Sequence, residues 1–119
     1  TSEVLIDGNN QGDIGELVLK DREMLSNNGI IIISATMDKR NKQILAGPEI
    51  LTRGFIYVKD SLELVDSIKE ISLEVIRNNT HNNYVDYNKV KNMIRDNLSK
   101  YLYDQTGNKP MIITVLQEI

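Results

Sequence analysis

The sequence predicts an α+β domain in which a three-stranded sheet carries two helices on one face, in the order β-β-α-α-β. The β-branched run at 30–33 and the segment MIITVL at 111–116 are typical of strands. Two longer segments between them place apolar residues at helical spacing. A chain of 119 residues without cysteine is large enough to build such a core without disulfides. Because a sheet and an amphipathic helix each bury one apolar side, the helices are expected to pack together on the sheet.

The first two strands are predicted from Ile30 to Met37 and from Gln43 to Leu51, joined by a polar hairpin loop at 38–42. Gly47-Pro48 interrupts the second strand. Since proline has no N–H to donate to a ladder, this dipeptide predicts a bend or a bulge. A short apolar run at 55–58 continues the strand beyond Gly54.

Two amphipathic helices follow. The first is predicted from about Ser61 to Asn78, where Asp60 and Glu63 resemble a capping box. The second follows the N-cap residue Asp86 and ends at Gly107, before Pro110. Their apolar faces consist of Leu64, Val65, Ile68, Ile71, Val75 and Ile76 in the first helix and of Val90, Met93, Ile94, Leu98, Tyr101 and Leu102 in the second. A last strand is predicted from Met111 to Leu116.

Residues 1–28 are interpreted as a linker ahead of the domain at 29–119. They begin with a short strand at Val4–Ile6, followed by a polar turn and a helix that Asp13 caps and Gly29 ends. The chain starts without methionine, which favours a fragment of a longer protein. The N-terminus has no signal-peptide pattern, and no apolar run approaches the roughly 20 residues that span a bilayer. A cytoplasmic location without membrane contact is therefore expected.

Few residues are available for catalysis, because the chain has one histidine and no cysteine. His81 lies in a polar loop without a partner at metal-ligand spacing, and no nucleophile–base pair can be proposed. Carboxylate pairs such as Glu70 and Glu74 lie on helix faces that are expected to be exposed. We predict no catalytic residue, metal ligand or cofactor site in this chain.

The candidate contact residues are four cations. Lys39, Arg40 and Lys42 lie in the hairpin loop, where a solvated turn is favoured over a phosphate contact. Arg53 lies where the chain leaves the sheet, and pairing with a carboxylate across an interface is favoured over RNA phosphate. The net charge of −3 disfavours strong autonomous RNA binding, which usually depends on phosphate neutralisation.

Both faces of the predicted sheet carry apolar residues, since Ile30–Ile33 and Met111–Ile113 are apolar without alternation. If both helices cover one face, the other face must meet solvent or a partner. A large exposed apolar surface usually marks an interaction site. The residues alone therefore predict a protein–protein interaction module.

Three segments together resemble the C-terminal part of bacterial ribonuclease J, a metallo-β-lactamase/β-CASP nuclease: GDIGELVLKDREMLSNNGI (12–30), GPEILTRGFIYV (47–58) and YLYDQTGNKPMI (101–112). The resemblance implies a 5′-to-3′ exonuclease and endonuclease of RNA processing and decay. It implies that a divalent metal, zinc or manganese, is held by a His- and Asp-rich motif of a catalytic domain that this chain lacks.

For this chain the resemblance implies a non-catalytic C-terminal domain that serves subunit association and supports activity. The implied partners are ribonuclease J subunits, in a homo- or hetero-oligomer, and RNA through the full-length enzyme. Gly107-Asn108 and Ile113-Thr114 are less basic and less proline-rich than expected of the more active paralogue, which favours the second paralogue. Two alternatives stay open: an RNA-contacting module that uses the four cations, and a nuclease that acts through carboxylates and a divalent ion.

Overall fold

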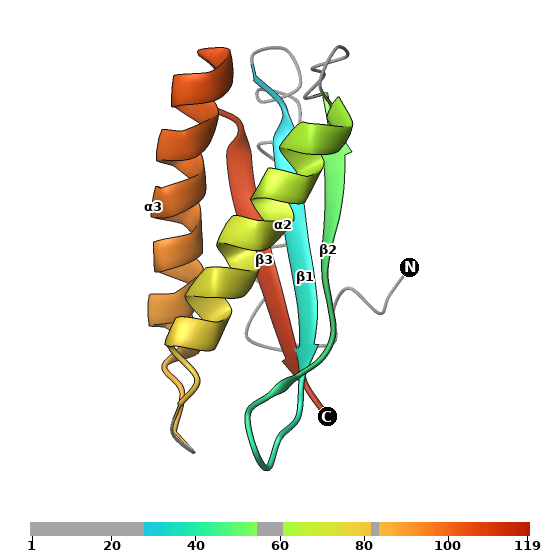
Figure 1. Ribbon diagram of the computed structural model, residues 1–119, viewed down its shortest axis with the longest axis vertical. Helices are drawn as coiled ribbons and strands as arrows, with labels where there is room; N and C mark the ends of the chain where they lie inside the picture. Colours follow the sequence, from blue (N-terminus) through green and yellow to red (C-terminus); the bar gives the residue numbers. More distant parts are fainter. Residues whose placement is uncertain (1–27, 55–60, 82–83) are drawn as a thin grey trace.

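The computed structural model describes residues 28–54, 61–81 and 84–119. Its elements are β1 (Ile30–Met37), β2 (Ile44–Arg53), α2 (Ser61–Asn78), α3 (Tyr87–Thr106) and β3 (Met111–Glu118). The strand order is β2-β1-β3, and the central strand β1 pairs antiparallel with β2 and parallel with β3. Both helices lie on the same face of this sheet (Figure 1). The predicted α+β fold and its β-β-α-α-β order are confirmed.

The core lies between the two helices and one face of the sheet. Alternate residues of β1 point toward the helices, so Ile31, Ile33 and Met37 are fully buried. From the opposite side, α2 and α3 contribute side chains at helical spacing. The described members of this apolar cluster are Ile31, Ile33, Ala35, Met37, Leu64, Ile68, Val75, Ile76, Val85, Val90, Ile94, Leu98, Leu102, Ile112 and Leu116.

β2 is bent at the predicted dipeptide. Gly47 and Pro48 are joined by a cis peptide bond, and the β1–β2 register shifts between Ser34 and Met37. Gly47 has φ of 85°, in the region that favours glycine, and a Cβ atom there would lie 2.7 Å from the carbonyl oxygen of Ser34. The predicted interruption is confirmed, and the strand continues beyond the predicted end at Leu51 to Arg53.

The ends of α3 are set by the two predicted caps. The Asp86 carboxylate accepts a hydrogen bond from the N–H of Lys89, and Gly107, at φ of 77°, donates its N–H to the carbonyl of Tyr103. α2 has the predicted bounds. None of the described helices is long and apolar enough to cross a membrane. The predicted linker strand at 4–6, the linker helix from 13, the apolar run at 55–58 and the cap at Asp60 lie outside the described residues.

Candidate interaction surfaces

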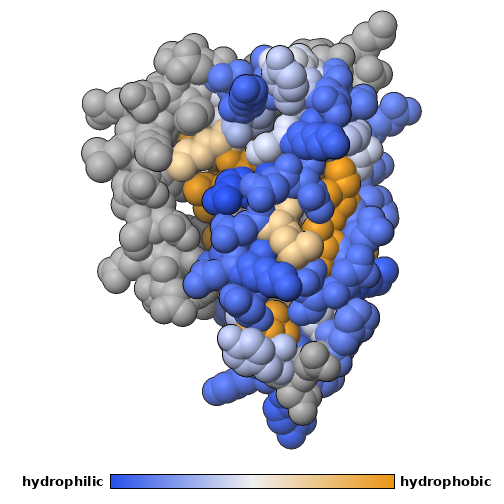
Figure 2. Space-filling model, turned by 90° about the vertical axis from the view of Figure 1, so that its left-hand side faces the viewer, coloured by the Kyte–Doolittle hydropathy of each residue, from blue (hydrophilic) through white to orange (hydrophobic). Residues whose placement is uncertain are grey.

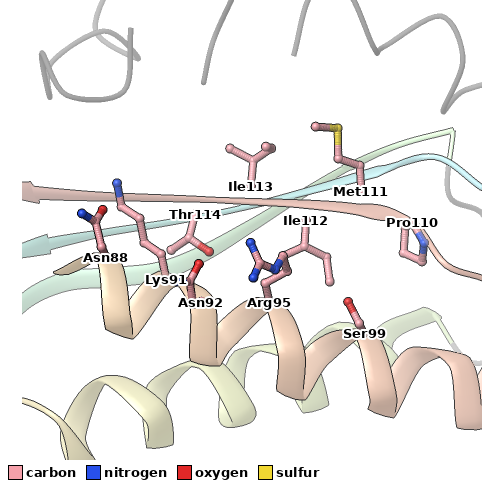
Figure 3. Close-up of a pocket in the computed structure, with 10 residues that line it drawn as sticks. All are labelled: Asn88, Lys91, Asn92, Arg95, Ser99, Pro110, Met111, Ile112, Ile113 and Thr114. Atoms are coloured by element: carbon pink, nitrogen blue, oxygen red, sulfur yellow. The ribbon is translucent and has the colours of Figure 1, made fainter. Parts of the chain in front are cut away.

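The sheet face turned away from the helices carries a row of aliphatic side chains. Ile32 of the central strand pairs in register with Leu51 of β2 and with Ile113 of β3, so these three residues lie side by side across the sheet. Ile32 and Ile113 are half-buried, and Leu51 is 59% exposed. Figure 3 shows Ile113 directed away from α3. We call Leu51, Ile32 and Ile113 the outer row; no described helix covers it (Figure 1).

A groove of about 510 Å³ lies beside the outer row. It follows β1 and β2 toward the bulge, and Glu49 is the one charged residue among those that line it. The lining residues are Ile32, Ser34, Ala35, Thr36, Ala46, Gly47, Glu49, Ile50, Leu51, Val115 and Gln117. The outer face is therefore apolar along the outer row and becomes polar toward the hairpin end of the sheet.

The hairpin loop contains three of the four predicted contact residues. Lys39 and Arg40 are exposed there. Lys42, at φ of 62°, is half-buried, and its Nζ lies 2.8 Å from Oε2 of Glu118 at the end of β3. Tyr87, the first residue of α3, donates its hydroxyl hydrogen bond to the same oxygen. Lys42 thus joins the loop to β3 and α3, a structural role that its sequence position alone did not reveal.

Arg53 lies at the other end of β2 from the loop cations. The ten residues of that strand separate them by about 30 Å, at roughly 3.3 Å per residue. Arg53 is exposed and has no ion pair within the described part of the chain. The four predicted cations therefore do not form one phosphate site. Whether any of them contacts RNA or a partner stays a prediction.

The pKa of the Glu118 carboxyl is lowered, mainly by the hydrogen bond from Lys42 and then by the one from Tyr87. Burial, with the hydrogen bond to Glu118, raises the pKa of the Tyr87 hydroxyl, which therefore stays a donor over the whole range in which Glu118 titrates. In the same loop, the N–H groups of Asn41 and Arg40 lower the pKa of Asp38. Both carboxylates are thus stabilised in their charged form by the fold.

As the pH is lowered, we expect the free energy of unfolding of the domain to decrease more steeply in the wild type than in Glu118→Gln. A carboxyl whose pKa is depressed by folding stabilises the protein fully above its unfolded pKa, near the ordinary value of 4.5. That stabilisation is lost as pH falls through the lower folded pKa. Urea unfolding of both proteins at about pH 7 and about pH 3 measures the difference. Asp38 titrates in both proteins, so its contribution cancels. Equal pH dependence in the two proteins would contradict the assignment.

No described group of three His, Cys, Asp or Glu side chains is arranged to hold a metal ion. His81 is exposed in the loop after α2. We derive no hydrolytic step from the residues that the structure describes, and the absence of a metal site from this chain stays a prediction.

Comparison with known proteins shows which family and which relatives the chain resembles. Residues 17–119 match the family model described as the ribonuclease J C-terminal domain. The chain is 42% identical over 116 residues to Ribonuclease J2 of Bacillus subtilis (strain 168) and 40% identical over the same length to Ribonuclease J 2 of Staphylococcus aureus (strain NCTC 8325 / PS 47). These matches cover 98% of this chain and 21% of each relative, so the chain spans about one fifth of the length of the curated relatives it matches. The names of these relatives agree with the predicted second paralogue.

Proposed function

The chain belongs to the ribonuclease J family, as its C-terminal domain, and on this premise we propose that it is a non-catalytic domain through which subunits of a ribonuclease J-like enzyme associate. The complete enzyme would process and degrade RNA as a 5′-to-3′ exonuclease and endonuclease. Its divalent metal, zinc or manganese, and its RNA would be bound in the catalytic part of the longer protein. The names of the relatives, all ribonucleases, support this wider role.

The outer row is the observation that carries the association role. It places three aliphatic side chains in register across all three strands, on the face opposite the helix-covered core. Burying an exposed side chain such as Leu51 stabilises a complex by roughly 1.5–3 kcal/mol before the costs of association. In a two-fold dimer the same row contributes from both subunits, which doubles the apolar area.

The RNA-contacting alternative has less support. Lys42 is engaged with Glu118, and Arg53 lies at the far end of β2 from Lys39 and Arg40. The loop therefore presents two exposed cations, on a chain with a net charge of −3. Non-specific RNA binding usually needs a larger basic surface.

Sedimentation velocity of the 119-residue chain tests the association role. We expect concentration-dependent self-association, or binding to the remainder of the enzyme, that Leu51→Glu weakens at least about tenfold, because the new carboxylate would be desolvated against aliphatic side chains. The matched control is Leu62→Glu, which places the same change on α2 at a side chain that is 81% exposed. A strict monomer at millimolar concentration that also fails to bind the remainder of the enzyme would reject the proposal. So would association that tolerates Leu51→Glu.

A further inference from the structure

A second surface lies where β3 borders α3, and we propose that it binds an extended acidic peptide of a partner protein by strand addition. The peptide would pair with the edge of β3 that no described strand occupies, and it would place carboxylate side chains in the groove between β3 and α3. This inference does not depend on the association role of the outer row. The two surfaces have only Ile113 in common, and the backbone of Ile113 pairs with β1 whether or not a peptide is bound.

The first argument is the direction of the β3 backbone. β3 is an edge strand, and β1 is its one partner among the described strands. The N–H of Met111 donates to Gly29 and that of Ile119 donates to Met37, both on the β1 side. Since successive N–H groups of a strand point to opposite sides, the even-numbered residues from 112 to 116 direct their N–H and C=O groups to the edge opposite β1, where no described strand lies. These groups are the template that an added strand needs.

The second argument is that the sequence and register of β3 itself lack charge, proline and bulge along most of the strand. Protein edges are protected by charged side chains, by proline or by bulges. β3 has no charged residue before Glu118 and no internal proline, and its register with β1 is continuous from Ile30 to Met37. The seven residues from Met111 to Gln117 carry no charge, and an edge of this length can pair with a peptide.

The third argument is the chemistry of the groove, whose volume is about 650 Å³. Along α3 it is lined by five polar side chains, which Figure 3 shows on the helix beside the first half of β3: Asn88, Lys91, Asn92, Arg95 and Ser99. No carboxylate lines the groove. Arg95 reaches Asp96 at 3.5 Å, but both side chains are more than half exposed, so this ion pair is weak and easily exchanged. Arg95 can therefore exchange this contact for a carboxylate of a bound peptide.

A peptide fits these features better than RNA does. Single-stranded RNA is usually bound by stacking its bases on aromatic rings, and no aromatic residue lines the groove. The surface around α3 is hydrophilic with small hydrophobic patches (Figure 2). Unpaired backbone groups, in contrast, are matched by another backbone. In strand addition the main chain supplies affinity and the side-chain pockets supply specificity.

The probe is a fluorescein-labelled peptide of about eight residues in which valine and glutamate alternate, matching the length of β3. Fluorescence anisotropy with the 119-residue chain should show saturable binding. A peptide of alternating valine and lysine should bind at least about tenfold more weakly. In amide hydrogen exchange, the acidic peptide should slow the amide of Thr114 and leave that of Ile113 unchanged, because the latter already points toward β1.

Two variants and one control sharpen the test. Arg95→Glu should weaken peptide binding at least about tenfold. Thr114→Pro should abolish binding, because it removes an N–H on the edge opposite β1 and leaves the ladder with β1 in place. Lys100→Glu makes the same kind of charge change at an exposed position of α3 that does not line the groove, and should leave binding unchanged. If circular dichroism shows that Thr114→Pro is unfolded, the inference is tested by peptide binding to Arg95→Glu and by hydrogen exchange of the Thr114 amide in the wild type.

Several results would overturn the inference. One is no binding of the acidic peptide at millimolar concentration, and another is binding that tolerates Arg95→Glu. An oligouridylate RNA that binds more tightly than the peptide, with the same dependence on Arg95, would assign the groove to RNA. Protection of the Thr114 amide that grows with protein concentration, without peptide, would assign the edge to a second copy of the chain.

Discussion

Gly47→Ala is expected to lower the free energy of unfolding by about 3 kcal/mol. Gly47 has φ of 85°, where a residue with a Cβ atom costs roughly 1–2 kcal/mol. The new Cβ would also lie 2.7 Å from the carbonyl oxygen of Ser34 and 3.1 Å from the Cα of Ala35. Both neighbours are backbone atoms of the central strand, so they cannot move aside as a flexible side chain would. Relieving the contact must disturb the β1–β2 bulge, which costs a further 1–3 kcal/mol or so.

The chain supplies a matched control for this substitution. Gly107, at the end of α3, has a similar φ of 77°, and a Cβ built on it meets nothing within 4 Å. Gly107→Ala should therefore cost about 1 kcal/mol, from backbone conformation alone. Urea unfolding followed by circular dichroism measures both variants. Equal losses would show that the approach of Gly47 to Ser34 has no energetic consequence.

Gly47 and Gly107 show which structural features the sequence predicts and which it does not. Gly107 is predictable as a helix end, because it follows a helical pattern and precedes Pro110. The bend at Gly47-Pro48 is predictable because proline cannot donate to a ladder. The close approach of Gly47 to Ser34 is not, because it depends on how the neighbouring strand is placed. Local chemistry sets the position of the bend, and tertiary structure sets its cost.

The same distinction applies to the surfaces. The apolar runs of β1 and β3 predict an apolar second face, but the outer row also needs the strand order. Only the central position of β1, antiparallel to β2 and parallel to β3, brings Leu51, Ile32 and Ile113 into one row. Sequence periodicity says which residues share a face of a strand and does not say which strand is central.

Sequence periodicity also does not predict contacts between residues that are distant in the chain, because these contacts depend on the strand order. Lys42 and Glu118 are 76 residues apart in sequence, and their pairing depends on both strands that flank β1. The groove beside β3 had a signal, because five polar residues without a carboxylate recur at helical spacing along one side of α3, from Asn88 to Ser99. A polar helix side is ordinarily a solvated surface, so its spacing became informative only once the edge of β3 was placed next to it.

The other large effect is expected in the core, where Leu98→Ala should lower the free energy of unfolding by about 3–4 kcal/mol. Leu98 is fully buried in α3 and belongs to the cluster that joins both helices to the sheet. Its truncation removes apolar contacts and leaves a cavity, and the many isoleucine and valine side chains of this cluster have few rotamers with which to fill it. Because small domains have total stabilities of about 5–15 kcal/mol, this loss should move the urea midpoint strongly.

Leu62→Ala is the control for the core substitution, since the Leu62 side chain on α2 is 81% exposed and its truncation should change stability by less than about 0.5 kcal/mol. The comparison separates burial from the general effect of shortening a leucine in a helix, because alanine favours the helix slightly at both positions. A loss at Leu98 no larger than that at Leu62 would mean that the two helices do not share one core with the sheet. In that case the outer face could not be identified as the face opposite the described helices, and both interaction surfaces would lose the framework that positions them.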